Sequence, residues 1–554
     1  MGYKKLLLFI LLISTVLVSC KKKSDKLADS IPASAQSVTY VNMQSLIQKS
    51  NYNIMENSAV KRGLNIAKAM LKDEGAVKIL EDFEKNSGAF GITLNREAYL
   101  FSSGNYSGFV VPVDNEDKIK EALLKFKVVE EASITKEKGA YFISSDPALS
   151  IAWDKHKFIA LFKWGGNQDT TSLSARRLLS QNEKESILAD VNYQKFDKEK
   201  TDISVYLSSG MYAELGANIS FFNHSRFAKS SNEEMATYLK KVSEQFKGIS
   251  IGLYTSFDEG KITTSSKYFF QTNKEESNLK DLVKSSTGEL TDKYLQYIAA
   301  NPIFAGAFSL KGSGYYTLLS KMGLFDSTQK ELAESGIDLK SLMESINGNI
   351  VFALNGMTVA PKNPNISDLD AMLNMQDNSA KTSVDFSLIA ELSPQNNIAH
   401  FIDSLISKQP KGMILKTGEG QYSIKNKDYN GVFGVKDNAF YFSTNQDFAS
   451  KFNSSIVKSS FSNKAKGNCG FIYGDFRTLH KYAKDYAKNA LLPSQAYISQ
   501  LVDGLLMLET IEMHSKLDMT SELTINFVNK KENSLAAICK FVDGVLTKVS
   551  SQML

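Results

Sequence analysis

Apolar residues recur along this chain at two spacings, one typical of strands and one typical of helices. Residues 109–113 form an apolar run that predicts a strand, and Asp114 after it is a good N-cap residue for a helix. The helix is predicted by apolar residues spaced i, i+3, i+4 and i+7, which give one buried face. These residues are Ile119, Ala122, Leu123 and Phe126.

The same pattern returns 279 residues later, in residues 388–405. An apolar run precedes Ser393, a good N-cap residue, and Pro394, which suits the first position of a helix. The apolar residues that follow are Ile398, Phe401, Ile402 and Leu405. Residues 162–169 and 440–447 also match, in the same order along the chain.

This ordered series predicts a tandem duplication, with a first repeat at residues 31–287 and a second at residues 288–554. Alternation of apolar and polar residues at 261–270 and 521–528 predicts strands with one buried face. Strands separated by single helices indicate an α+β fold. We expect each repeat to be a mostly antiparallel sheet with helices packed on one face.

The two predicted repeats differ at one place. The first connects two strands by a short turn at residues 102–108, whereas the second has residues 357–383 there. This longer segment is polar and contains two prolines. Long loops are often disordered or functional, so residues 357–383 are interpreted either as a disordered or decorative segment or as a binding loop.

The first twenty residues carry the pattern of a bacterial lipoprotein signal peptide. Two lysines precede an apolar run at residues 6–18, and Cys20 follows directly on a small residue. The apolar run is shorter than the roughly 20 residues that a membrane-spanning helix needs, which argues against an uncleaved anchor. We therefore expect residues 1–19 to be removed, Cys20 to be lipidated and residues 20–30 to form a basic tether.

Composition and charge narrow the classes of partner. Without residues 1–19, the formal net charge of +5 falls to +3, because two lysines are lost. A nearly neutral chain argues against nucleic-acid binding, for which a clustered basic face is typical. Apolar residues make up 43% of the chain and charged residues 23%, as in an ordinary folded protein.

Residues 248–252 read Gly-Ile-Ser-Ile-Gly and match the GxSxG pattern of the nucleophile elbow in serine hydrolases. This makes Ser250 a candidate nucleophile. The elbow requires a sharp strand-to-helix turn, whereas the residues after Gly252 continue as a strand-like run. We therefore interpret Ser250 as a residue inside a strand and keep a serine hydrolase as the alternative function.

Two tryptophans and two cysteines are the remaining candidates for a site. Trp153 and Trp164 flank a predicted hairpin and are candidate platforms for a ligand, although either can also belong to the core. Cys469 and Cys539 could form a disulfide in an oxidising compartment or remain buried thiols. The five histidines have no metal-ligand spacing, so we expect neither a metal site nor a cofactor.

Residues 31–50 and 346–353 resemble segments of a known family. They are similar to large Bacteroidota lipoproteins that are catalogued only as a domain of unknown function. The resemblance covers most of residues 20–554 and implies a location in the cell envelope but no catalytic residue. In that phylum, acidic residues after the lipidated cysteine mark export to the cell surface. Residues 21–23 are lysines instead, which favours the periplasmic side of the outer membrane.

From the sequence we expect a lipid-anchored envelope protein with a non-catalytic binding or scaffold role. A membrane anchor and a duplicated body without a convergent set of catalytic residues motivate this expectation. The membrane is the expected partner through the lipid on Cys20. Whether a further partner is a protein, a glycan or a lipid is left open.

Overall fold

The structure is a computed structural model that divides into two compact units. The first unit is Met1–Thr272 together with Lys531–Leu554, and the second unit is Asn273–Lys530. The structure describes residues 27–71, 73–85, 87–93, 95–146, 149–163, 173–211, 240–298, 302–321, 329, 333, 338–359, 382–407, 414–426, 429–445, 448, 460–488 and 502–552.

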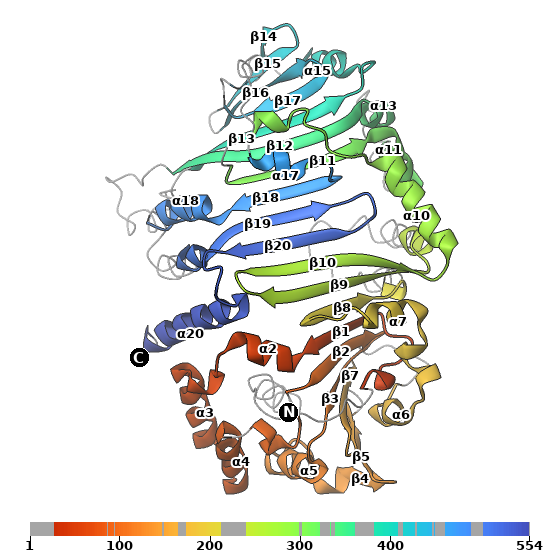
Figure 1. Ribbon diagram of the computed structural model, residues 1–554, viewed down its shortest axis with the longest axis vertical. Helices are drawn as coiled ribbons and strands as arrows, with labels where there is room; N and C mark the ends of the chain where they lie inside the picture. The colour runs from red at the N-terminus through yellow and green to blue at the C-terminus, as the bar shows by residue number, and fades with distance from the viewer. Residues whose placement is uncertain are drawn as a thin grey trace. The chain divides into compact units, whose positions relative to one another are not determined.

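The described part of the first unit contains one antiparallel sheet. Its strands follow the order β4-β5-β6-β7-β3-β2-β1-β8-β9-β10 (Figure 1). Their bounds are β1 Ser37–Asn42, β2 Glu97–Ser103, β3 Tyr106–Pro112, β4 Ile134–Glu137, β5 Ala140–Asp146, β6 Leu149–Trp153, β7 Lys157–Lys163, β8 Ile203–Leu207, β9 Ile249–Asp258 and β10 Lys261–Phe270.

The described part of the second unit also contains one antiparallel sheet, with the order β14-β15-β16-β17-β13-β12-β11-β18-β19-β20 (Figure 1). The bounds are β11 Phe304–Lys311, β12 Ile346–Val359, β13 Thr382–Leu392, β14 Ile414–Gly418, β15 Gln421–Asn426, β16 Tyr429–Lys436, β17 Ala439–Ser443, β18 Gly470–Asp475, β19 Leu508–Ser515 and β20 Ser521–Phe527. The α+β class with mostly antiparallel sheets is therefore confirmed.

The helices connect and cover these strands. Those of the first unit are α2 Met43–Ser50, α3 Ser58–Met70, α4 Glu74–Lys85, α5 Glu116–Lys125, α6 Ala175–Ser180, α7 Val191–Asp197 and α20 Ser534–Gln552. Those of the second unit are α10 Asn273–Ser286, α11 Gly312–Lys321, α13 Leu339–Glu344, α15 Ile398–Ser407, α17 Ser460–Ala465 and α18 Phe476–Lys488.

The two sheets have the same strand order, and each strand of the second carries a number ten higher than its counterpart in the first. Common ancestry of the two halves stays a prediction. The compact units do not end at the predicted repeat boundary, because α10 belongs to the second unit and α20 to the first. Within the first unit, Tyr52 donates a hydrogen bond to Asp543 of α20 at 2.6 Å. The amide of Asn533 also donates to the carbonyl of Phe257 at 2.9 Å.

The predicted strand–helix pair at residues 109–126 is present as β3 and α5. Ile119, Ala122 and Leu123 are all fully buried, as the spacing predicts. The N-cap is Asn115 rather than Asp114, because the Asn115 side chain accepts hydrogen bonds from the backbone N–H groups of residues 117 and 118. A one-residue error of this kind follows from two adjacent residues that both cap well.

The matching pair at residues 388–405 is present as β13 and α15, but its predicted helix start is wrong. The helix begins at Ile398, and Ser393 and Pro394 lie in the connection before it. The backbone carbonyl of Asn397 accepts the hydrogen bond from the N–H of Phe401, which marks the first turn. Proline serves a turn as well as a helix start, so its presence did not fix the position.

The predicted tether at residues 20–30 is wrong for its last four residues, which are folded. Leu27–Ser30 form a 3₁₀ turn, η1, and Leu27 and Ala28 are buried in the core of the first unit. Their burial removes apolar surface from water, so this segment belongs to the folded body. Residues 1–26, including Cys20, lie outside the described residues, as do Trp164 and residues 360–381 of the predicted long connection.

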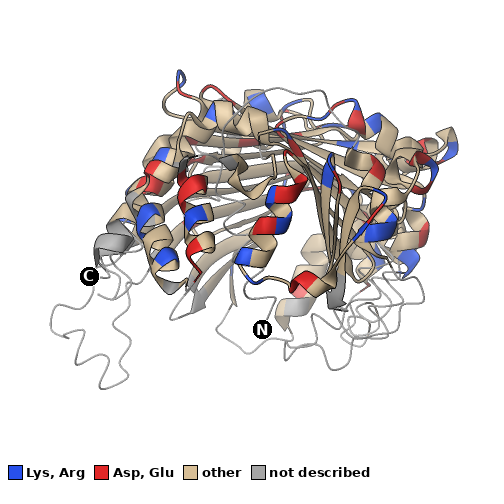
Figure 2. Cartoon of the chain, turned by 90° about the horizontal axis from the view of Figure 1, so that it is seen from below, with Lys and Arg blue, Asp and Glu red and all other residues tan. Residues whose placement is uncertain are grey.

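Helices lie on both faces of the first sheet, which differs from the expectation of one covered face. Alternate residues of β5 and β6 enter two separate cores: Phe142 and Ala152 pack with α6 and α7, whereas Tyr141 and Ile151 pack with α4 and α5. Side chains of a strand point alternately to opposite faces, so each core belongs to one face. Figure 2 shows Lys, Arg, Asp and Glu mixed on the helices and at strand ends, while the strands are largely free of them.

Candidate functional site

The sheet of the second unit has apolar residues on both faces around β11. Ala305 and Ala307 enter the buried core of this unit, whereas Phe304 and Phe308 point to the opposite face and are 38% and 40% exposed. Period-two alternation places the phenylalanines on one face and the alanines on the other. Part-exposed aromatic rings on a strand that is already buried on its other face make this face a candidate interaction surface.

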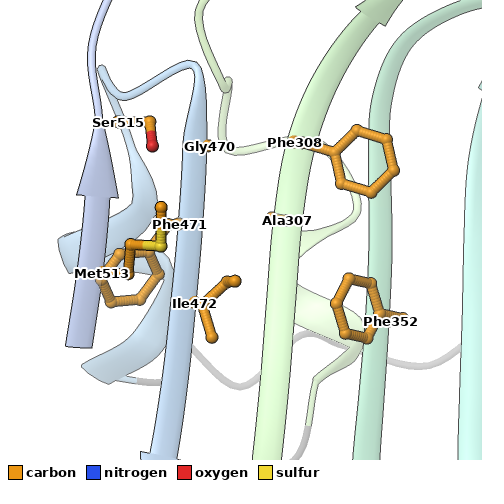
Figure 3. A pocket seen from close by; sticks show the side chains of 8 residues that line it. All are labelled: Ala307, Phe308, Phe352, Gly470, Phe471, Ile472, Met513 and Ser515. Atoms are coloured by element: carbon orange, nitrogen blue, oxygen red, sulfur yellow. The ribbon is translucent and has the colours of Figure 1, made fainter. Parts of the chain in front are cut away.

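A pocket of about 230 Å³ opens on this face (Figure 3). Its lining comes from β11, β12, β18 and β19 and consists of Ala307, Phe308, Phe352, Gly470, Phe471, Ile472, Met513 and Ser515. The rings of Phe308 and Phe352 stand on one side of Ile472, and the side chain of Met513 stands on the other (Figure 3).

Two glycines explain why the pocket exists. Gly470 pairs with Phe308 on one side and with Ser515 on the other, so no side chain fills the space between those two residues. Gly306 pairs with Phe352, and a Cβ atom at Gly306 would lie 2.2 Å from the Phe352 ring. That ring therefore lies over Gly306. Glycine inside a strand often marks such a close approach.

The pocket offers almost no polar chemistry. None of its eight lining residues is ionisable, and its single hydroxyl belongs to Ser515. The Ser515 oxygen accepts a hydrogen bond from the Ser521 hydroxyl at 3.1 Å. The strands beneath it are paired on both sides, so their backbone groups are used within the sheet. The arrangement suits binding of an apolar group, and the lining places no acid or base beside the Ser515 hydroxyl.

The first unit fills the corresponding position. Thr39 lies four residues before α2, as Phe308 lies four residues before α11, and Thr39 pairs with Val205, which pairs with Leu253. Valine and leucine thus stand where the second unit has Gly470 and Ser515. The two sheets share a strand order but differ in the residues that make the pocket.

Ser250 does not lie at the strand-to-helix turn of a nucleophile elbow. It lies inside β9, is 2% exposed and is followed by further strand residues. Its hydroxyl oxygen accepts a hydrogen bond from Asn192 at 3.1 Å and forms another with the Tyr206 hydroxyl at 3.0 Å, while Tyr206 donates to Asp190 at 2.7 Å. Burial, together with nearby Asp190, raises the pKa of Tyr206, which keeps that phenol protonated and able to donate. The network is structural, and the interpretation of Ser250 as a strand residue agrees with it.

Trp153 is a core residue, so the proposed ligand platform at this position is wrong. Its side chain is fully buried and stacks on Tyr141 with ring centroids 4.9 Å apart. The indole N–H donates to the backbone carbonyl of Glu116 at 3.0 Å. The hairpin was predicted correctly, because β6 and β7 pair across the turn that follows Trp153. A buried indole with a satisfied N–H has no face left for a ligand.

Cys469 and Cys539 are free thiols, so the disulfide considered from the sequence is not formed. Both are partly buried, and burial raises the pKa of each thiol. A raised pKa disfavours the reactive thiolate. Among the described residues, no group of three or more His, Cys, Asp or Glu side chains could hold a metal ion. None of the described helices is long and apolar enough to cross a bilayer.

The pocket residues were missed by the sequence analysis. Two signals could have found them. One is the run Phe304-Ala-Gly-Ala-Phe308, which is apolar on both faces of a strand. The other is the presence of two glycines, Gly470 and Gly474, in a strand of six residues. Neither signal shows which strands lie beside each other. That information comes only from the pairing of β11 with β18.

A family model described as "Domain of unknown function (DUF4836)" matches residues 28–535. The chain belongs to this family. The match to the DUF4836 family includes every residue that lines the pocket. It confirms the resemblance to a domain of unknown function, whereas membership of a Bacteroidota lipoprotein group stays a prediction. None of the curated proteins matches the chain.

Two solved structures share some similarity with this DUF4836 member. They are described as "Structure of crystal form I of TP0453" and "Structure of crystal form III of TP0453". The sequence identities are 7% and 9%, with TM-scores of 0.22 and 0.23. The similarity covers 48% of this chain in both cases, and 89% and 90% of the two other chains. Values this low do not establish a shared fold.

Proposed function

We propose that this protein is a lipid-anchored envelope protein that binds an apolar ligand through its second unit. The observation that carries the binding role is the pocket on the face of β11, β18 and β19, with its uncharged lining and exposed Phe308. Concave apolar surfaces with few polar groups are typical of small-molecule sites. A binding role without catalysis fits a lining that holds no titratable side chain.

The proposed anchor rests on the sequence pattern before Cys20. Two lysines, an apolar run and a small residue precede this cysteine, and lysines follow it at residues 21–23. Lipidation at Cys20 would attach the folded body to a membrane without a spanning helix. The lysines favour the periplasmic side of the outer membrane. The small net charge of +5 over the whole chain supports a role without nucleic acid.

Substitution of Cys20 by alanine is expected to abolish the lipid anchor. Cells fed a labelled fatty acid should incorporate label into the natural chain but not into the Cys20→Ala chain, because the lipid attaches to that sulfur. The Cys469→Ala chain is the matched control and should keep the label, since Cys469 lies in the folded body. Label retained in the Cys20→Ala chain would contradict the anchor.

Filling the pocket is expected to weaken binding of an apolar probe. The probe is N-phenyl-1-naphthylamine, whose fluorescence rises in apolar surroundings. It is tested on the chain from residue 21 onward, which keeps every described residue. In Gly470→Val the new Cβ has room, since its nearest neighbour is the Ser515 Cβ at 3.6 Å, and the branched side chain then occupies the pocket. Affinity should fall about tenfold, or roughly 1.4 kcal/mol, because the new side chain takes the space in which the probe makes its apolar contacts.

Val384→Ser is the matched control for this measurement. Val384 is 42% exposed on β13 of the same sheet and does not line the pocket. Its replacement should leave probe binding unchanged. Equal binding by the natural chain and Gly470→Val, or no binding by the natural chain, would reject the pocket as a ligand site.

A further inference from the structure

We infer that the apolar ligand is an unbranched acyl chain whose oxygen-bearing end lies at Ser515. This inference rests on the proposed binding function and specifies the ligand class of the same pocket. It is carried by the absence of free backbone partners around the pocket, by the pocket's size and by the position of its one hydroxyl.

The strands around the pocket leave no backbone group for a ligand. β11 pairs with β12 and β18, and β18 pairs with β11 and β19. β12 also pairs with β13, and β19 with β20, so all four lining strands are interior to the sheet. A peptide lying in the pocket would bury N–H and C=O groups without partners, which is costly. A hydrocarbon chain has no such groups and meets only matching apolar surface.

The size of the pocket fits one segment of a chain. A cavity of about 150 Å³ is enough for a single benzene ring, whereas complete drug-sized ligands need roughly 300–1,000 Å³. At about 230 Å³, this pocket lies between these values. It therefore takes part of a longer molecule, and the rest extends past the rim, where Phe308 is 40% exposed.

The lining also fits a flexible, narrow occupant. The side chains of Phe352 and Ile472 are rigid, but Met513 has an unbranched thioether that adjusts to the shape beside it. Met513 and Ile472 are paired neighbours on adjacent strands, so the flexible side chain of Met513 lies directly beside that of Ile472. A chain of methylenes can follow such a flexible surface at any point along its length.

Ser515 gives the occupant a direction. Ser515 ends β19 and lies beside Gly470, the first residue of β18, so the hydroxyl stands at one end of the pocket. The Ser515 oxygen accepts from Ser521, which leaves the Ser515 hydrogen able to donate to a ligand oxygen. A carboxylate or an ester carbonyl supplies such an oxygen next to a hydrocarbon chain.

The test is photolabelling of the full chain in its own membranes. The probes are a straight-chain fatty acid with a diazirine a few carbons from its carboxylate, on the segment expected inside the pocket, and a phosphatidylethanolamine that carries the same acyl chain. Adducts are mapped by mass spectrometry of peptides. We expect adducts on β11, β18 and β19 in the natural chain, and about tenfold fewer in Gly470→Val. Val384→Ser is the matched control and should label as the natural chain does. Ser515→Leu is a second filling variant, should Gly470→Val fail to fold.

Competition by unlabelled fatty acids adds the chemical criterion. The affinity of the unlabelled fatty acid, measured as its protection of the pocket from photolabelling, should rise about fourfold for each methylene added to its chain. The rise should stop once the chain fills the pocket. Labelling by the free fatty acid alone identifies a fatty acid as the source, and labelling by the phospholipid probe identifies a membrane lipid. Either result supports an acyl chain.

Two results would overturn the inference. One is labelling that Gly470→Val and Ser515→Leu both leave unchanged. The other is binding of N-phenyl-1-naphthylamine in the pocket without any acyl adduct there, which would retain an apolar site but reject this ligand class. Loss of both the naphthylamine binding and the acyl adducts would instead reject the proposed function itself.

Discussion

Replacement of Trp153 by alanine is expected to lower the free energy of unfolding by about 3–5 kcal/mol, the range for a large aromatic side chain removed from a core. The side chain is fully buried, stacks on Tyr141 and lies among residues of α4 and α5. Alanine leaves a cavity there and also removes the donor to the carbonyl of Glu116. The measurement is urea unfolding followed by circular dichroism, on the chain from residue 21 onward.

Two variants separate the causes of this loss. Trp153→Phe keeps most of the apolar volume and should cost only about 1–2 kcal/mol, mainly for the unsatisfied carbonyl and the smaller ring. Leu100→Ala changes an apolar side chain that is 50% exposed in the same sheet and should cost about 0.5 kcal/mol or less. A Trp153→Ala chain as stable as the Leu100→Ala chain would contradict the position of Trp153 in the core.

The second large effect is expected at Asp202, which joins three segments of the first unit. Its side chain is nearly buried and accepts hydrogen bonds from the Ser45 hydroxyl at 2.5 Å and from the backbone N–H of Phe257 at 2.7 Å. It also forms an ion pair with Lys49 at 2.6 Å. Asp202→Ala leaves the Ser45 hydroxyl and the Phe257 N–H without this acceptor, and leaves Lys49 with the more distant Asp258. We expect a loss of roughly 3 kcal/mol. The same urea unfolding measures it.

Asp258→Ala provides the comparison for Asp202. Asp258 also lies near Lys49, at 3.8 Å, but its side chain is 46% exposed. Exposed ion pairs contribute about 0–1 kcal/mol, so this variant should unfold almost as the natural chain does. Equal losses for the two variants would show that the Asp202 contacts add nothing beyond general charge balance.

The sequence predicted those elements whose signal is local. The stripe of Ile119, Ala122 and Leu123 determined α5 because helical spacing depends only on neighbours along the chain. The start of α15 was misplaced, since Pro394 suits a turn as well as a helix. The burial of Leu27 and Ala28 was missed because two apolar residues are too few for a period.

The pocket depends on information that no local pattern contains. Gly470 opens a space only because Phe308 lies beside it, and these residues are far apart in the sequence. The first sheet is the converse case, with the same strand order but a larger residue in place of the glycine. There, Val205 stands beside Thr39, so an identical strand order has no corresponding gap between these neighbours. Apolar alternation could predict a strand at residues 304–308, but not its partner.

The assignment of α20 to the first unit has a consequence for biosynthesis. Residues 531–554 leave the ribosome after the whole of the second unit, yet Asp543 within them accepts the hydrogen bond from Tyr52. The first unit therefore lacks α20 while the 258 residues of the second unit, Asn273–Lys530, are translated. A nascent chain halted at Lys530 should be cut by proteases within residues 43–70, where α2 and α3 lack their late-arriving neighbour.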